Sequence, residues 1–125
     1  MIHVFVTSHG GMAEGILESV EMLIGKQENL TAITFGKEMG VDELEECFQK
    51  EIVDVSEKNQ YLILCDLKGG TPFNTASRFS FKNENVAVMY PLRSQHINCL
   101  LKYFHIHLPG CLHPHIFHIP YSFNS

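Results

Sequence analysis

Apolar residues in the first 90 positions recur with two alternating periods. Two segments, 13–24 and 41–55, carry apolar residues at helical spacing opposite an acidic face, which predicts amphipathic helices. Short apolar runs rich in β-branched residues predict the buried strands of a parallel sheet. These predicted strands span 2–8, 30–35, 61–66 and 85–90. The run at 61–66 is the most apolar, so we expect it to lie centrally in the sheet.

A third helix is predicted after the glycine pair that follows the third strand. Thr71 is placed to cap this helix and Pro72 to occupy its first position, where the missing N–H of proline is tolerated. The alternation of strands and helices predicts an α/β fold, with a doubly wound, mostly parallel four-stranded sheet flanked by helices.

Residues 91–125 break this pattern, and we expect them to form an irregular C-terminal segment of the same domain. All 14 acidic residues lie at or before Glu84, and only two formally charged residues follow Tyr90. The same segment contains six of the eight histidines and four of the five prolines. The chain therefore divides into an ordered α/β core at 1–90 and an atypical terminus.

The composition argues against several classes of protein. A chain of 125 residues with 45% hydrophobic and 18% charged residues suits one globular domain. The net charge of −5 argues against nucleic-acid binding, and the longest apolar runs fall far short of the roughly 20 residues of a membrane-spanning helix. The N-terminus lacks the pattern of a secretory signal, so the cytoplasm is the expected compartment. In that reducing compartment we expect free thiols at Cys47, Cys65, Cys99 and Cys111.

Polar residues gather where the first and third strands are predicted to end. His9 follows the first strand, and Asp66 follows the third, with Gly69, Gly70 and Thr71 close behind. Ligands of doubly wound sheets bind beyond the carboxyl ends of the strands, near the point where the strand order reverses. If these two strands are neighbours, the two loops meet at one site.

The residue types in these loops suit phosphoryl chemistry. A neutral imidazole such as that of His9 attacks through its unprotonated nitrogen, and a carboxylate such as Asp66 at the other nitrogen fixes the tautomer and stabilises positive charge on the ring. Backbone N–H groups at helix N-termini bind phosphoryl oxygens, and glycine allows close approach. The candidate phosphate-binding residues are Gly10, Gly11, Gly69, Gly70 and Thr71. Each feature alone fits an ordinary turn, surface or capping role, whereas together they favour a phosphohistidine site.

Two segments together resemble a known family. "VFVTSHGGMAEGILESVEMLIG" and "LILCDLKGGTPFNTASR" are similar to the enzyme IIA component of the mannose/fructose/sorbose family of the bacterial phosphoenolpyruvate-dependent sugar phosphotransferase system. The resemblance covers residues 1–90 and implies a parallel sheet flanked by helices. It also implies a phosphocarrier that takes a phosphoryl group from the histidine-containing phosphocarrier protein. The carrier passes this group to a IIB component, which delivers it to the incoming sugar.

The resemblance assigns roles to three residues by match. His9 would be the phosphorylated histidine, Asp66 its hydrogen-bond partner and Thr71 a residue beside the phosphate. No metal or organic cofactor is implied. Association with the membrane would be indirect, through the transporter, and members commonly form a homodimer by exchanging a C-terminal strand.

The terminus departs from the family pattern. After a strand like "VAVMY" the family usually continues with glycine, an Asn-Leu-Pro-like turn and a long amphipathic helix, whereas this chain continues with "PLRSQHINCLLKYF" and a proline- and histidine-rich end. Such a composition resembles out-of-frame translation or a replaced terminus, which we hold as a hypothesis. The departure bears on the last helix, the exchanged strand and the dimer, and it leaves His9 and Asp66 in place.

Other functions stay open at this level. An IIA-like domain also serves as a phosphoryl donor to dihydroxyacetone kinase, and phosphorylated His9 could act as a switch in a regulatory or interaction module. Hydrolase activity is disfavoured, because no second base and no nucleophilic Ser or Cys motif accompanies His9. Imidazole and thiolate groups of the tail are potential zinc or copper ligands, although their spacing fits no closed metal site. These groups belong to His105, His107, Cys111, His113, His115 and His118.

Overall fold

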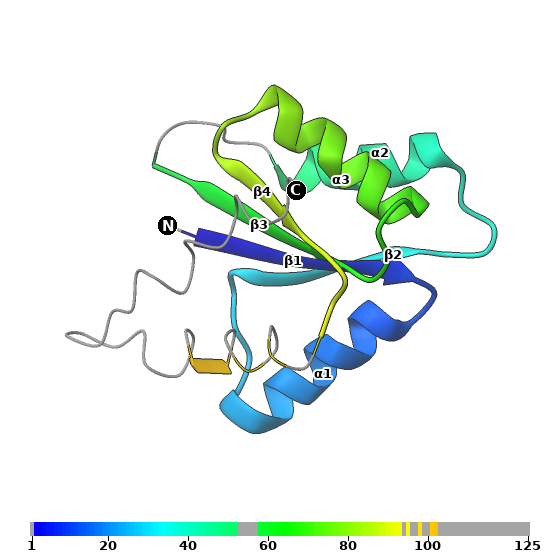
Figure 1. Ribbon diagram of the computed structural model, residues 1–125. Coiled ribbons are helices and arrows are strands. Elements are labelled where there is room, and N and C mark those ends of the chain that lie inside the picture. The colour runs from blue at the N-terminus through cyan, green and yellow to red at the C-terminus, as the bar shows by residue number, and fades with distance from the viewer. Residues whose placement is uncertain (1, 53–57, 94, 96–97, 99–100, 103–125) are drawn as a thin grey trace.

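The computed structural model describes residues 2–52, 58–93, 95, 98 and 101–102. These residues contain strands and helices in strict alternation (Figure 1). The elements are β1 (Ile2–His9), α1 (Met12–Ile24), β2 (Leu30–Phe35), α2 (Val41–Glu51), β3 (Gln60–Cys65), α3 (Thr71–Lys82) and β4 (Val86–Met89). The observed bounds of β2 equal the predicted ones; β1 and α1 differ from prediction by one residue at one end, and β3 and β4 by one residue at both ends.

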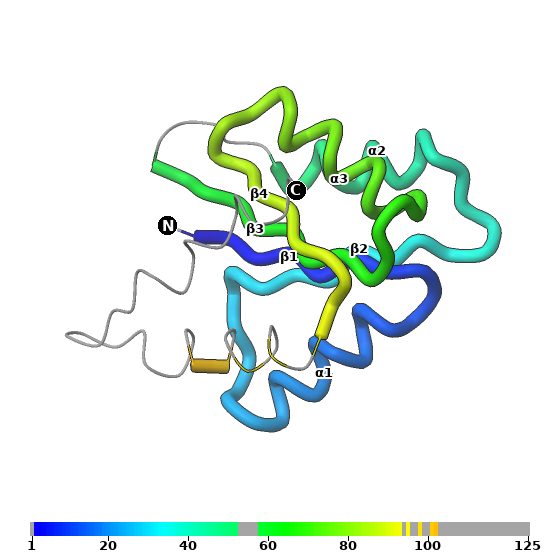
Figure 2. Tube along the Cα trace, in the orientation of Figure 1, coloured from blue at the N-terminus to red at the C-terminus, as the bar shows by residue number. Residues whose placement is uncertain are grey.

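The sheet is parallel throughout its described strands and has the order β2-β1-β3-β4. Helix α1 covers one face, and α2 and α3 cover the other (Figure 1). The predicted doubly wound, parallel α/β fold is therefore confirmed, with β3 inside the sheet. Because the chain moves from β1 to β2 on one side and later to β3 on the other, the strand order reverses at β1. Figure 2 shows the trace of β1 and β3 running side by side, although they are far apart in sequence.

Side chains alternate across the sheet and build an apolar layer on each face. Val4 and Val6 of β1 are buried in the layer that contains Val20 of α1. Phe5, which points the opposite way, is buried in the layer that contains Phe48 of α2. The strands are thus held from both faces, which makes their carboxyl ends a rigid support for the loops that follow.

The second helix is shorter than its apolar periodicity predicts. It ends at Glu51, and Ile52 is already its C-cap, with φ −96° and ψ 72°. Ile52 is nevertheless buried in the core, so an apolar residue at this position serves packing without continuing the helix. The remainder of the predicted helix, 53–55, lies outside the described residues.

The predicted cap of the third helix is wrong by one residue. Gly70 is the N-cap, with φ −76° and ψ 169°, while Thr71 and Pro72 are the first and second helical residues. The N–H of Asn74 donates to the carbonyl of Gly70 at 2.9 Å, so the first turn closes one residue earlier than expected. Proline is tolerated in this turn because its missing N–H has no intrahelical partner to lose.

The described part of the terminus contacts the core on the α1 side, where Leu92 and Leu101 pack against the buried layer. No helix within the described ranges is both long and apolar enough to cross a membrane. Cys47 and Cys65 are free thiols, as expected. The expectations for Cys99, Cys111 and the histidine-rich stretch from 105 onward fall outside the described residues.

Leu44 of α2 is fully buried, whereas Leu23 at the end of α1 is 67% exposed. We expect Leu44→Ala to lower the free energy of unfolding by about 2–5 kcal/mol, because it leaves a cavity in the core. Leu23→Ala, the same chemical change at the surface, should alter it by no more than about 0.5 kcal/mol. Urea unfolding followed by circular dichroism measures both changes, and equal losses for the two variants would contradict this packing.

Candidate functional site

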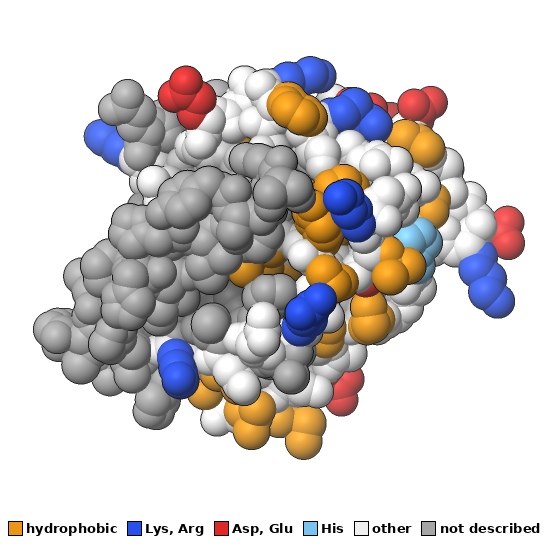
Figure 3. Space-filling model, viewed as in Figure 1, with side chains coloured by type: hydrophobic (Ala, Val, Ile, Leu, Met, Phe, Trp, Pro, Cys, Tyr) orange, Lys and Arg blue, Asp and Glu red, His pale blue; other side chains and the backbone are white. Residues whose placement is uncertain are grey.

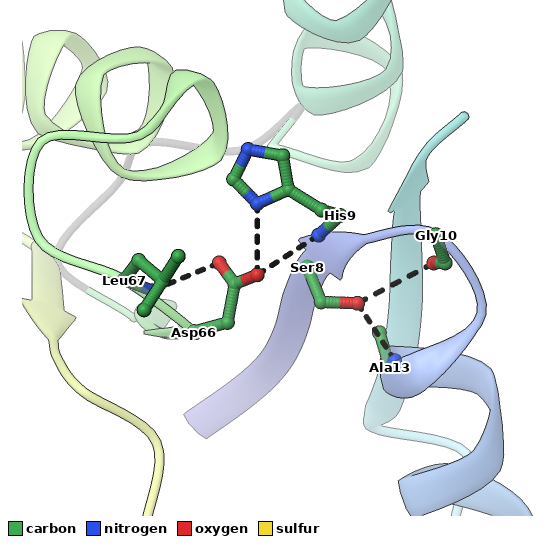
Figure 4. A network of polar contacts seen from close by, with 6 residues as sticks. All are labelled: Ser8, His9, Gly10, Ala13, Asp66 and Leu67. Atoms are coloured by element: carbon green, nitrogen blue, oxygen red, sulfur yellow. Dashed lines mark hydrogen bonds and ion pairs between the residues drawn. The ribbon is translucent and has the colours of Figure 1, made fainter. Parts of the chain in front are cut away.

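The carboxyl ends of β1 and β3 bring two polar residues together. His9 is the last residue of β1, and Asp66 directly follows β3, its neighbour in the sheet. The Nδ1 atom of the His9 imidazole lies 2.9 Å from Oδ2 of Asp66 (Figure 4). The two loops predicted to meet therefore do meet, at the point where the strand order reverses.

Asp66 is only 8% exposed, and its carboxylate accepts three hydrogen bonds. Oδ2 accepts the backbone N–H of His9 at 3.0 Å as well as the ring N–H, and Oδ1 accepts the N–H of Leu67 at 2.9 Å (Figure 4). Burial alone would raise the pKa of Asp66, but the hydrogen bonds from His9 and Leu67 outweigh burial and lower it. Asp66 is therefore an ionised acceptor, and this network assigns the ring proton of neutral His9 to Nδ1.

The other ring nitrogen of His9, Nε2, is not part of the contact with Asp66. The side chain of His9 is 44% exposed, in contrast to the 7% of Asp66. The Phe35 ring stands edge-to-face against the imidazole, with the two centroids 5.8 Å apart and the planes inclined at 76°. On the α3 side, Gly70 lies so close that a Cβ there would be 2.8 Å from Cε1 and 3.4 Å from Nε2 of His9. Nε2 thus lies beside the N-terminus of α3.

The turn between β1 and α1 is shaped by Ser8 and Gly10. The buried Ser8 hydroxyl accepts the N–H of Ala13 at 2.8 Å, which caps the first turn of α1 (Figure 4). Gly10 has φ +64°, a left-handed conformation that glycine adopts without strain, and its N–H donates to the carbonyl of Phe35 at 2.9 Å. Because the Gly10 amide is engaged in this way, Gly10 acts by shaping the turn, and Gly11 begins α1 as its N-cap.

The loop between β3 and α3 contains the other predicted residues. Gly69 has φ +83°, and its carbonyl accepts the side-chain amide of Asn74 at 3.1 Å. Gly70, beside the imidazole, and Thr71 follow at the N-terminus of α3. A helix N-terminus points backbone N–H groups and a partial positive charge toward a neighbouring anion. Of the predicted phosphate-binding residues after β3, Gly70 lies against the imidazole, and Gly69 and Thr71 flank it in the chain.

Several residues shape this site although the sequence patterns did not single them out. Ser8 lies in the quoted motif, and a hydroxyl just before a helix is a recognisable capping signal. Phe35 and the pair Lys68 and Tyr90 carry no such local signal. The Lys68 Nζ lies 5.5 Å from the centroid of the Tyr90 ring, which itself packs edge-to-face on Phe73 at 4.5 Å. These contacts tie the loop after β3 to the end of β4.

Apolar side chains are exposed in the segments that follow His9 and Asp66. Met12, at the start of α1, is 46% exposed, and Leu67, next to Asp66, is 58% exposed. Figure 3 shows a histidine with hydrophobic side chains beside it. Exposed apolar residues around a reactive atom are typical of a surface that contacts another macromolecule.

The described residues contain no group of three or more His, Cys, Asp or Glu side chains that could hold a metal ion. Cys65 precedes Asp66 but is fully buried, and this burial, together with the charge of Asp66, raises the pKa of its thiol far above the ordinary value. Cys65 therefore remains protonated and does not serve as a nucleophile.

The fold and the site together define an open α/β domain that presents a carboxylate-oriented histidine at the switch point of its sheet. A family model described as "PTS system fructose IIA component" matches residues 3–91. The chain belongs to this family, the mannose/fructose type of EIIA, as its two motifs predict. The match ends where the composition of the chain changes.

Individual relatives agree with this assignment. The PTS system fructose-specific EIIA component of Bacillus subtilis is 34% identical over 86 residues, which cover 69% of this chain and 59% of the relative. The PTS system mannose-specific EIIAB component of Escherichia coli K12 is 34% identical over 88 residues, which cover 70% of this chain and 27% of that protein. The chain thus spans less than two thirds of the length of these relatives. A crystal structure of the phosphotransferase system component EIIA from Streptococcus agalactiae superposes with a TM-score of 0.77 at 27% identity, covering 98% of this chain and 91% of that one.

Gly70→Ala tests the close approach to the imidazole. Its backbone angles suit any residue, so the variant should fold, but the new Cβ should displace the His9 ring from Asp66. Gly40→Ala is a matched control, because Gly40 is also an N-cap with extended backbone and nothing lies within 4 Å of a Cβ there. In NMR spectra the His9 imidazole signals should change only in Gly70→Ala, and unchanged signals would contradict the geometry.

The lowered pKa of Asp66 makes a prediction about pH. A carboxylate with a lowered pKa adds stability above the pKa of an unfolded aspartate, about 3.9. This stability is lost as the pH falls through the lower folded-state value. The difference in unfolding free energy between the wild type and Asp66→Asn should therefore be largest near neutral pH and shrink on acidification below about pH 4. Denaturant titrations at a series of pH values measure this difference in unfolding free energy. A difference that stays constant with pH contradicts a lowered pKa of Asp66.

Proposed function

We propose that this chain is a phosphocarrier of the bacterial sugar phosphotransferase system, in which Nε2 of His9 carries the phosphoryl group. The observation that carries this proposal is the 2.9 Å contact between His9 Nδ1 and the buried Asp66 carboxylate, which in the neutral imidazole places the free lone pair on Nε2 of a side chain that is 44% exposed. Membership of the EIIA family supports the same reading.

The transfer step needs no external proton. The lone pair of Nε2 forms a bond to phosphorus while the phosphorus–nitrogen bond of the donor phosphohistidine breaks, and the electron pair of that bond stays on the donor imidazole. The proton on Nδ1 of His9 stays in place, hydrogen-bonded to Asp66. The ring gains positive character as the new bond forms, and the adjacent carboxylate stabilises it.

The phosphoryl oxygens require donors, and the N-termini of α1 and α3 supply them. Gly69, Gly70 and Thr71 lead into α3 next to His9, and Gly11 begins α1 at the end of the same turn. Backbone N–H groups fixed at these positions need little reorganisation when the phosphoryl group arrives. Gly10 contributes the left-handed turn rather than an amide, since its N–H is bound to Phe35.

The partners in this proposal are the histidine-containing phosphocarrier protein as donor and a IIB component as acceptor. A relative named as an EIIAB component supports a IIB-type partner. The exposed apolar side chains of Met12 and Leu67, in the segments that follow His9 and Asp66, suit direct protein contact, which phosphoryl transfer between two histidines requires. The protein would act in the cytoplasm and reach the membrane only through its transporter, as a monomer or a homodimer.

Phosphohistidine mapping tests the proposal. The protein is incubated with phosphoenolpyruvate and the general transfer proteins, and the wild type should acquire about one equivalent of acid-labile phosphate, as phosphorylation at His9 alone implies. His9→Ala should acquire none. His3→Ala is the matched control, because His3 lies on the same strand at the opposite end, where its ring stacks on Tyr61 at a centroid distance of 5.1 Å.

Three outcomes separate the candidate functions. Label on His9 that passes to a IIB component supports the carrier. Label on His9 that passes to no partner favours the regulatory switch, and label that passes only to dihydroxyacetone kinase favours that donor role. One equivalent of label on His9→Ala, measured on protein that circular dichroism shows to be folded, rules out His9 as the phosphorylated residue.

A further inference from the structure

Phe35, at the carboxyl end of β2, contacts the reactive imidazole from the side opposite Asp66. Its Cα is paired with that of His9 in the parallel register of β1 and β2. Since β1 lies between β2 and β3, the ring of His9 stands between Phe35 on one neighbouring strand and the loop of Asp66 and Gly70 after the other. The edge-to-face contact of 5.8 Å and 76° falls within the geometry that aromatic pairs prefer.

The position of Phe35 is itself fixed. Its carbonyl accepts the N–H of Gly10 at 2.9 Å, which connects it to the turn that follows His9. Its side chain packs with Met39 against the buried layer beneath α2 and α3. The Sδ atom of Met39 accepts the N–H of Gly36 at 3.2 Å, which closes the loop directly after Phe35. Phe35 is thus held by the core and contacts His9 at the exposed end of β1.

We propose that Phe35 is a positioning residue for phosphoryl transfer, which it assists by holding the imidazole of His9 in the orientation that turns Nε2 outward. This inference rests on the proposed function. A hydrogen bond at Nδ1 leaves the ring free to swing about that contact, and Asp66 and Gly70 both act from the β3 side. Phe35 limits movement of the His9 ring on the β2 side. A ring confined in this way loses less conformational freedom on reaching the in-line geometry of transfer.

The experiment uses the full chain and three variants. Phe35→Leu keeps an apolar side chain but removes the ring, and Phe35→Tyr restores the ring. Phe79→Leu is the control for loss of an aromatic residue from the same core, because Phe79 packs on Phe48 at 5.6 Å, within the layer between α2, α3 and the sheet. Two quantities are measured: the rate of phosphoryl transfer at saturating donor protein, with its KM, and the NMR signals and side-chain couplings of the unphosphorylated His9 ring.

We expect Phe35→Leu to slow transfer at saturation by about 2- to 12-fold, the range that one aromatic pair supports, with KM unchanged. The couplings of His9 should show averaging over rotamers. Phe35→Tyr, which keeps an aromatic ring, should show the wild-type transfer rate and the wild-type His9 couplings. Phe79→Leu should also leave the rate and the couplings unchanged, even where it lowers the melting temperature. Wild-type rates and a fixed ring in Phe35→Leu overturn the inference, and a change in KM alone makes Phe35 a docking residue instead. If the wild type accepts no phosphoryl group, the proposed function fails, while the NMR measurement still decides whether Phe35 positions the ring.

Discussion

The buried carboxylate of Asp66 is the interaction on which the site depends. An ionised carboxylate removed from water is costly unless donors replace its hydration, and here the donors are the backbone and ring of His9 and the backbone of Leu67. Two of these three hydrogen bonds cross from β3 to β1. The need to satisfy one buried charge therefore fixes the relative position of two loops that are 57 residues apart in sequence. It also decides which nitrogen of the imidazole carries a proton.

The topology of the sheet brings these groups together. Parallel strands place all their carboxyl ends on one edge, and the order β2-β1-β3-β4 puts a strand on each side of the one that ends in His9. Each neighbour supplies a different kind of contact: β3 leads to a carboxylate and a glycine-rich helix start, and β2 ends in an aromatic ring. Polar and apolar contacts to the same imidazole thus come from opposite sides. The buried layers on both faces keep these strand ends in place.

Much of this organisation could be predicted from the sequence, and the exceptions have physical reasons. The strands and the meeting of His9 with Asp66 follow from periodicity and topology, which act over the whole chain. The contact of Phe35 with His9 depends on strand register, which no local pattern encodes. The helix start at Gly70 was misplaced because a threonine before a proline is a typical cap, whereas the chain closes its first turn on the Gly70 carbonyl and keeps this glycine against the imidazole. The unusual composition of 91–125 removes the periodicity on which such predictions depend.

The contrast in exposure between the two central residues bears on which chemistry the site can perform. The side chain of His9 is 44% exposed and that of Asp66 only 7%, so the nucleophile faces the surface while the charge that orients it is withdrawn from water. Hydrolysis of a phosphohistidine would need a base aligned on an attacking water molecule. The Asp66 carboxylate already accepts three hydrogen bonds, from the backbone and ring of His9 and from the backbone of Leu67. The Asp66 carboxylate is thus committed to the backbone and ring of His9, which suits the orienting role that the proposed carrier requires.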